Sequence, residues 1–183
     1  MGKTHAVITP VLREFIQAQH VFFVGTAPLS SGGHINISPK GLDSLRVVDE
    51  LTVAYADLIG SGVETIAHIQ ENRRIVLMFC AFEGPPKIVR LHGQGRVVEP
   101  GDPEFESLRQ QFPDYEALRS IIKVHCNRVS DSCGFGVPLY EFQSHRPQLE
   151  DWADRKSKEQ LVEYVANKNA TSIDGLPGAR STS

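Results

Sequence analysis

The sequence has few cysteines and no long apolar segment, and both absences restrict the class of protein. Three cysteines, Cys80, Cys126 and Cys133, occur among 183 residues. This odd, small number does not suit a disulfide framework and predicts a reducing compartment. The first ten residues lack the apolar stretch of a secretory signal, and no apolar run approaches the roughly 20 residues that a membrane-spanning helix requires. We therefore expect a cytoplasmic protein that does not interact with membranes.

The sequence also lacks a strong excess of charge. It contains 19 Lys and Arg against 22 Asp and Glu, so the net charge is −3, and both signs are mixed along the chain. Because no basic stretch stands out, binding to nucleic acid is not expected. The 40% hydrophobic content is sufficient for one sizeable core. We predict one domain in residues 1–145, with residues 146–183 forming its helical C-terminal arm and flexible tail.

Recognisable catalytic and metal-binding motifs are absent as well. His125, Cys126 and Cys133 are close in sequence, but a structural zinc site requires four ligands and usually contains Cys-x-x-Cys pairs. Adjacent strand residues point to opposite faces, so His125 does not serve Cys126 as a base. The sequence has no nucleotide-hydrolase phosphate loop, serine elbow or dinucleotide fingerprint. We expect no metal, and the catalytic residues remain unknown.

Short apolar runs separated by turn residues are the main pattern of the sequence. Strands of this kind are predicted at residues 21–26, 34–38, 45–48, 51–55, 74–82, 87–99, 121–129 and 139–142. Within 34–38, Ile35 and Ile37 alternate with polar residues, which predicts that Ile35 and Ile37 form a core face and that the other face is polar. The polar face, with Asn36 and Ser38, suits either contact with a ligand or the barrel exterior. Gly93 and Gly95 predict a bend or bulge in the long strand 87–99.

Helix signals are inserted between these strands without regular alternation. Thr9 and Pro10 predict a helix start, and Ser61 with Glu64 has the spacing of a capping box that begins a helix ending near residue 71. Asp102 predicts a third helix, and the apolar residues near 161–165 allow a fourth. Short connections between most strands favour an antiparallel barrel with added helices over a parallel doubly wound sheet.

An ordered series of motifs resembles a known family over about residues 10–100. It comprises Ser-Pro-Lys-Gly at 38–41, Tyr-Ala-Asp at 55–57, Gly-Ser-Gly at 60–62, and Asn72. In this order the series resembles the pyridoxamine phosphate oxidase-like FMN-binding split-barrel family. The resemblance implies a mainly β, antiparallel split barrel and a homodimer that binds FMN in a groove at the subunit interface. It also implies an oxidoreductase acting on a small molecule that the sequence does not identify.

The resemblance also implies which residues contact the flavin. The cofactor-binding residues that it indicates are Asn36, Ser38, Lys40, Tyr55, Ala56, Asp57, Gly60, Ser61, Gly62, Arg90 and Trp152. His145 and Arg146 resemble in position the basic C-terminal residues of the oxidases. The free amides at the start of the second helix suit a phosphate. Close pyridoxamine phosphate oxidases carry an Arg-Lys pair there, whereas this sequence has Glu64, which repels a phosphate unless it turns into the capping box.

The same residues have structural explanations, and other functions stay open. Ser61 and Glu64 suit mutual capping alone, Lys40 suits a solvated turn, and Arg90 suits a surface strand. Besides an FMN-dependent oxidoreductase, we consider a flavin-binding module without turnover. A haem-binding or haem-degrading split-barrel protein is a further alternative, with His34, His92 and His125 as candidate ligands.

Overall fold

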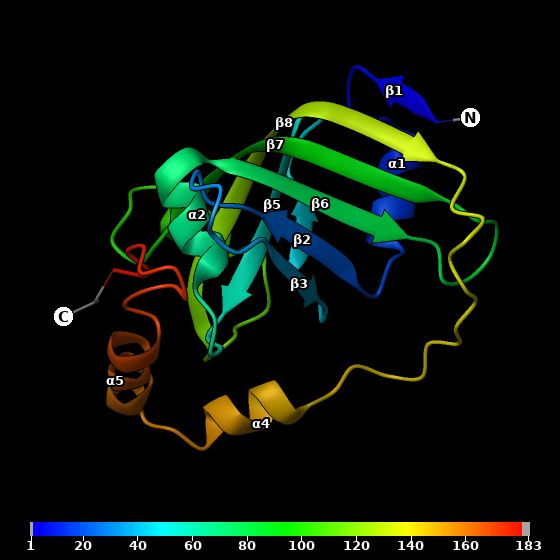
Figure 1. Cartoon of the computed structure of the whole chain (residues 1–183). Coiled ribbons are helices and arrows are strands. Elements are labelled where there is room, and N and C mark those ends of the chain that lie inside the picture. The colour runs from blue at the N-terminus through cyan, green and yellow to red at the C-terminus, as the bar shows by residue number, and fades with distance from the viewer. Residues whose placement is uncertain (1, 181–183) are drawn as a thin grey trace.

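The computed structural model describes residues 2–180 and consists mainly of one curled antiparallel sheet (Figure 1). The sheet has eight strands in the order β3-β2-β6-β7-β8-β5-β4, with β1 paired to β8. The strands are β1 Lys3–His5, β2 Phe22–Thr26, β3 Asn36–Lys40, β4 Leu45–Val47, β5 Thr52–Leu58, β6 Arg74–Cys80, β7 Ile88–Val98 and β8 Leu118–Ser132. The helices are α1 Pro10–Gln17, α2 Glu64–Asn72, α3 Phe105–Arg109, α4 Gln148–Asp154 and α5 Lys158–Lys168. The predicted fold class, a split barrel built mainly of β-strands, is confirmed.

The first helix forms where its capping signal predicts it. The backbone amide of Leu12 donates to the Thr9 hydroxyl at 3.4 Å, and Pro10 occupies the first turn, where no intrahelical partner is lost. Leu12 and Ile16 lie one turn apart and are buried, so α1 presents a single apolar face to the sheet beside β4.

Two layers of apolar residues hold the sheet together. The inner face of the curled sheet is filled by large buried side chains such as Tyr55, Leu77 and Leu91. On the other side of β5 and β8, Ala54 and Ile121 pack against the aromatic residues of α3 and its C-terminal turn. Because β5 is buried on both faces, its sequence lacks a simple alternation. Each large side chain removed from water in this way contributes about 1.5 to 3 kcal/mol.

The bulge predicted in the long strand is present. The pairing of β7 with β8 shifts register between His92 and Gly93. A β-carbon at Gly93 would lie 2.2 Å from the carbonyl oxygen of His125, so only glycine allows the two backbones to approach this closely.

The orientation of β3 is opposite to the prediction. Ile35 and Ile37 are 75% and 71% exposed, whereas Asn36, Ser38 and Lys40 point inward and are half-buried. The alternation itself is present, but the isoleucines lie on the outer face and the polar residues on the inner face. The reason is that the groups opposite the inner face of β3, such as Thr65 and Asp57, are polar. This inversion places three polar side chains at the inner edge of the sheet.

Three further predictions about secondary structure are wrong. Residues 139–142 form no strand: they belong to an extended strap, residues 133–147, in which Tyr140 donates one backbone hydrogen bond to Phe82. Asp102 does not cap α3, because its carboxylate accepts the amide of Glu99 at 2.8 Å instead. The second helix begins at Glu64 rather than after Ser61. The strand β1 and the helix α4 were not predicted.

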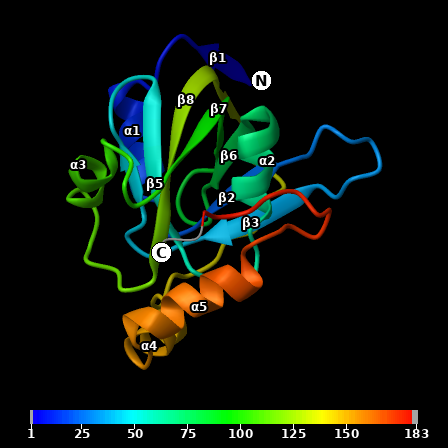
Figure 2. The ribbon, with the colours of Figure 1, turned by 90° about the vertical axis from the view of Figure 1, so that its left-hand side faces the viewer.

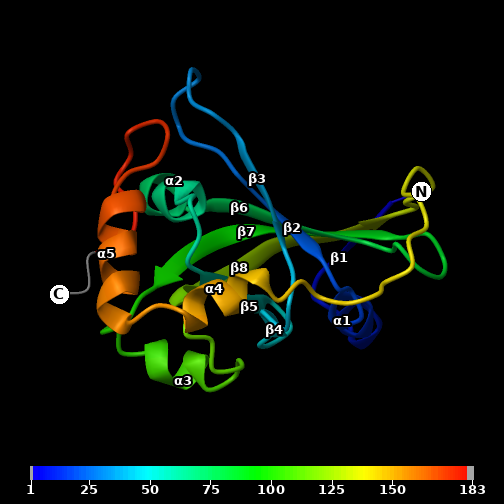
Figure 3. The ribbon, with the colours of Figure 1, turned by 90° about the horizontal axis from the view of Figure 1, so that it is seen from below.

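The C-terminal part of the described chain lies outside the sheet. Figures 2 and 3 show α4 and α5 together on one side, with the segment after α5 returning to α2. A bridge between Thr171 and Pro177 closes this segment into a hairpin, and Asp174 contacts His34 at 2.6 Å. The hairpin occupies part of the predicted tail, while residues 181–183 lie outside the described residues. The division into a domain and an arm stays a prediction. No helix between residues 2 and 180 has the length and apolar character needed to cross a bilayer.

Candidate functional site

An ion pair joins the edge strand β3 to β5, the strand next to the opposite edge of the curled sheet. Lys40 is the last residue of β3, and Asp57 lies near the end of β5, which is close to the opposite edge. The Lys40 Nζ lies 3.2 Å from the Asp57 Oδ1. The backbone amide of Ala56 donates to the carbonyl of Ser44 at 2.8 Å, which holds β5 against the turn that follows β3. Three of the predicted flavin-binding residues, Lys40, Ala56 and Asp57, therefore meet at this point.

A third charged group completes a buried triad, Lys40–Asp57–Arg119. The Nε and Nη2 of Arg119 donate to the Asp57 Oδ2 at 3.0 and 2.8 Å, and its Nη1 donates to the carbonyl of Gly62. The side chains of Arg119 and Asp57 are 5% and 1% exposed. Burial by itself would raise the pKa of Asp57, but Arg119 and Lys40 outweigh burial and hold that pKa below its usual value. The triad carries one negative and two positive charges.

Polar side chains continue from the triad along the inner face of β3. The Asn36 amide donates to the hydroxyls of Thr26 at 3.1 Å and Thr65 at 3.0 Å, and Ser38 donates to Asn36. The Thr26 hydroxyl also contacts the Nδ1 of the fully buried His68 at 3.0 Å. Burial lowers the pKa of His68, so this imidazole is neutral at pH 7. Most polar side-chain atoms of this network are hydrogen-bonded to one another, and the network links β3 to α2.

A cavity of about 360 Å³, here named the basic cavity, opens beside the triad. It is lined by Pro39, Lys40, Gly41, Leu42, Ser44, Ala56, Leu58, Ile59, Gly60, His145, Arg146 and Leu149. Three of these residues were predicted to bind flavin, and the strap adds two basic side chains. The volume lies within the range of small-molecule sites. The basic cavity is therefore where the predicted site has room for a ligand.

Comparison with known proteins identifies the family of this chain. The profile of the pyridoxamine 5'-phosphate oxidase family matches residues 8–133, which is more than half of the chain and includes the whole sheet apart from β1. The chain belongs to the pyridoxamine 5'-phosphate oxidase family. The resemblance expected from the sequence is thereby confirmed.

Individual relatives agree with this assignment. The pyridoxamine 5'-phosphate oxidase family protein ustO of Aspergillus flavus is 39% identical over 187 residues, which cover 93% of this chain and 75% of that protein. Among solved structures, HupZ of Group A Streptococcus superposes with a TM-score of 0.51 at 22% identity, over 67% of this chain and 91% of that one. A Clostridium acetobutylicum protein of the pyridoxinephosphate oxidase family gives a TM-score of 0.50 at 13% identity, over 66% and 84%. These two structures support the fold alone.

The start of α2 differs from what this family resemblance implies. Val63, not Ser61, occupies the N-cap, and the Glu64 carboxylate folds back to accept the Val63 amide at 3.1 Å. Its other oxygen accepts the amide of Ile173 from the C-terminal hairpin at 3.3 Å. Ser61 and Gly62 are exposed in the preceding loop. The helix terminus that was predicted to meet a phosphate therefore already holds a carboxylate, and the residues there do not fit a second anion.

The other predicted residues of this family member lie apart from the basic cavity. Tyr55 is fully buried beneath Lys40, and among residues 2–180 its hydroxyl has no hydrogen-bond partner. Arg90 lies near the start of β7, and its side chain donates a hydrogen bond to the Ser132 hydroxyl at 3.2 Å. Trp152 on α4 packs edge-on against Tyr164 at 5.0 Å. Asn36 and Ser38 belong to the polar network on the inner face of β3 and are not part of the cavity lining. Whether any of them binds flavin stays a prediction.

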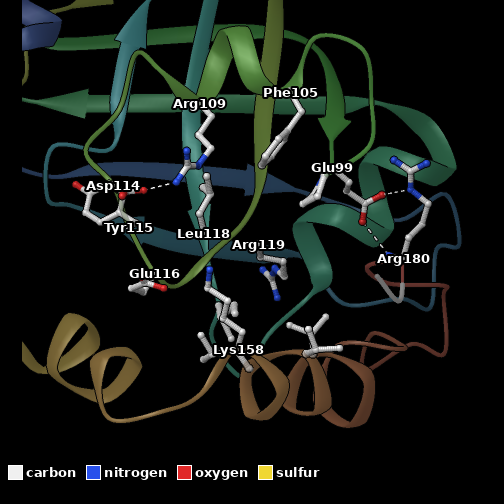
Figure 4. Close-up of a pocket in the computed structure, with 15 residues that line it drawn as sticks. Glu99, Phe105, Arg109, Asp114, Tyr115, Glu116, Leu118, Arg119, Lys158 and Arg180 are labelled. Atoms are coloured by element: carbon white, nitrogen blue, oxygen red, sulfur yellow. Dashed lines mark hydrogen bonds and ion pairs between the residues drawn. The ribbon is translucent and has the colours of Figure 1, made fainter. Parts of the chain in front are cut away.

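A second cavity, of about 500 Å³, lies behind the triad in this family member (Figure 4). Arg119 forms part of its wall, with Lys158 of α5 facing it, and the ion pairs Arg109–Asp114 and Arg180–Glu99 flank it. Sequence reasoning missed Arg119, which precedes the predicted strand 121–129 and pairs with a carboxylate 62 positions away. The only local signal was a basic residue beside an apolar run, and that signal is common on surfaces.

Proposed function

We propose that this chain is a flavin-binding member of its family and an FMN-dependent oxidoreductase. The observation that carries the proposal is the basic cavity, where residues of β3, β5 and the strap bring Lys40, His145 and Arg146 together around a space of ligand size. When bound, a flavin supplies hydride or electron transfer, so the chain needs no acid–base motif of its own. Its residues would bind and orient the ring and exclude water.

The anionic tail of the cofactor would be held at the basic cavity rather than at α2. Glu64 occupies the start of α2, which disfavours a phosphate there. Asp57 is shared by two cations, so the triad retains one uncompensated positive charge at the side where Lys40 faces the cavity. Arg146 adds a second, in a form suited to bidentate phosphate binding.

The proposal includes a homodimer, with the cofactor site at the subunit interface. The outer face of β3 supports it, since Ile35, Ile37 and the neighbouring Leu29 are exposed on an edge strand and its loop. Exposed apolar side chains grouped in this way are typical of an interaction surface. A cytoplasmic location stays a prediction.

Titration with FMN and with riboflavin tests the flavin proposal directly. Binding is followed by flavin fluorescence, after the absorption spectrum of the purified protein has been recorded. We expect Arg146→Gln to weaken FMN binding about tenfold, which corresponds to the loss of one charge-assisted phosphate contact, and to leave riboflavin binding unchanged. Arg155→Gln is the matched control, because Arg155 lies on the same arm outside the cavity lining. Absence of flavin binding by the unaltered protein would refute the proposal.

A reduction assay separates an oxidoreductase from a flavin-binding module without turnover. We expect NADH or NADPH to bleach the flavin absorbance of the loaded protein, and air to restore it. A protein that binds flavin but is not reduced by either nucleotide would support the passive module. A Soret band after haem titration, without flavin binding, would instead support the haem-binding alternative.

A further inference from the structure

A third cavity, of about 540 Å³, lies between the strap and the turn that joins α1 to β2. We name it the aromatic cavity. Its lining includes His20, Phe82, Glu83, Tyr140, Glu141 and Phe142. Figure 1 shows the strap descending from the end of β8, past the ends of the strands, before it turns toward α4. The aromatic cavity belongs to no site predicted from the sequence.

Ring stacking organises the wall of the aromatic cavity. His20 and Phe142 stack with ring centroids 3.6 Å apart and planes inclined by 12°, and Phe82 stacks on Tyr140 at 5.4 Å and 18°. Each pair joins one ring from the strap to one ring from the body of the protein. Flat rings with exposed faces are surfaces on which a further aromatic ring stacks favourably.

Backbone hydrogen bonds fix these rings in place. The amide of Tyr140 donates to the carbonyl of Phe82, and the amide of Phe142 donates to the Glu83 carboxylate, both at 2.8 Å. The strap is therefore held at two points two residues apart, and the side chains between them have a defined direction. A ligand would meet a preformed wall and would lose less binding energy to ordering the protein.

The charge of the lining restricts the class of ligand. Glu83 and Glu141 are its two carboxylates, and the lining contains no Lys or Arg. An anionic group would lie near two like charges with no counter-charge, which disfavours phosphates and carboxylates. The basic cavity has the opposite character, although the two adjoin: His145 of the basic cavity contacts Phe142 edge-on at 5.0 Å.

We propose that the aromatic cavity binds an uncharged or cationic aromatic small molecule. The stacked rings would supply the contact surface, and the two glutamates would select against anions. This proposal does not rest on the flavin proposal, because the two cavities share no lining residue. A ligand seated here would lie behind His20 and His145, one layer of side chains away from the basic cavity.

Three indole derivatives with short side chains of different charge test the proposal on the full chain without flavin. Tryptamine is cationic, indole-3-ethanol is neutral and indole-3-acetate is anionic, and binding is measured by saturation-transfer NMR and calorimetry. We expect the first two to bind and the anion to bind about tenfold more weakly or not at all. Glu83→Gln keeps the acceptor for the Phe142 amide and should narrow the difference between tryptamine and indole-3-acetate.

Variants of the strap locate the binding. Phe142→Ala and Tyr140→Ala should each weaken indole-3-ethanol binding about fivefold, as expected for loss of one stacking partner. Phe135→Ala is the matched control, since Phe135 lies on the same strap, is 81% exposed and is not part of the lining. Circular dichroism verifies that each variant is folded.

Several outcomes would overturn the proposal. Equal binding of all three indoles, or equal effects of Phe135→Ala and Phe142→Ala, would show that the cavity does not select its ligand. Failure of every indole to bind, together with a dimer that Tyr140→Ala dissociates, would show that a second copy of the chain covers the rings.

Discussion

Replacing Asp57 by asparagine tests whether the triad holds β3 against β5 and β8. The substitution keeps the shape of the side chain and removes its charge, which leaves Arg119 buried at 5% exposure without a counter-ion. Removing one partner of a buried ion pair costs about 3 to 5 kcal/mol. For a domain of this size that loss lowers the melting temperature by roughly 6 to 20 °C. Thermal unfolding at neutral pH, followed by circular dichroism, measures it.

The pH dependence of the same variant provides a second readout. The pKa of Asp57 is lower in the folded protein than its ordinary value of 3.8, so the unfolded chain binds the proton more readily. The stabilisation from this carboxylate is therefore complete above pH of about 4 and is lost as the pH falls through the folded pKa. The difference in stability between the protein and Asp57→Asn should shrink in acid.

An exposed pair serves as the control for this prediction. Asp43 pairs with Arg46 at 2.6 Å on the surface, so Asp43→Asn should change the free energy of unfolding by about 1 kcal/mol or less. If Asp57→Asn were no more destabilising than Asp43→Asn, or if its deficit were the same at low and neutral pH, the triad would not have the role assigned to it.

Two further predictions concern the strand bulge and the cysteines. Gly93→Ala should lower the free energy of unfolding by about 1 to 3 kcal/mol, because its β-carbon would meet the His125 carbonyl. Gly136→Ala should leave the free energy of unfolding unchanged, because its β-carbon meets nothing within 4 Å. Chemical denaturation compares the two variants, and equal stabilities would contradict the argument. Cys133 is exposed, while burial raises the pKa of the Cys126 thiol to about 11. One thiol per chain should therefore react rapidly with Ellman's reagent near neutral pH, and a second rapid thiol would contradict the assigned burial.

Features of the fold that depend on residues adjacent in the sequence were predictable from the sequence. Thr9 and Pro10 determine a helix start within one turn, and Gly93 marks a place where β7 approaches β8 too closely for a side chain. The face of β3 was not predictable, because alternation reports the period of a strand and not what lies opposite it. The inner side of β3 faces Thr65 and Asp57, which come from segments more than 15 residues further along the chain.

The candidate site was predictable to a similar extent. The resemblance placed Lys40 and Asp57 in one site, and the structure brings them into contact. Arg119 was missed because its interaction spans the sheet and leaves no spacing pattern. The start of α2 was mispredicted because the Glu64 carboxylate accepts the amide of the adjacent Val63 instead of the Ser61 amide that a capping box requires, and Ser61 lies upstream in an exposed loop.

The exposed face of β3 leads to a last prediction, about whether the flavin site needs a second subunit. Ile37 points outward while its neighbours Ser38 and Lys40 point toward the site, so Ile37→Lys adds charge to the outer face without altering an inward side chain. If this face is the dimer interface, the variant should elute as a monomer in light-scattering chromatography. A shared site then predicts that flavin binding is lost with the dimer, although the triad remains intact and the variant stays folded. Val11→Lys is the control, because Val11 is also exposed but lies on α1. A monomeric Ile37→Lys protein that binds FMN as tightly as the unaltered chain would show that one subunit builds the whole site, and a dimeric one would show that β3 is not the interface.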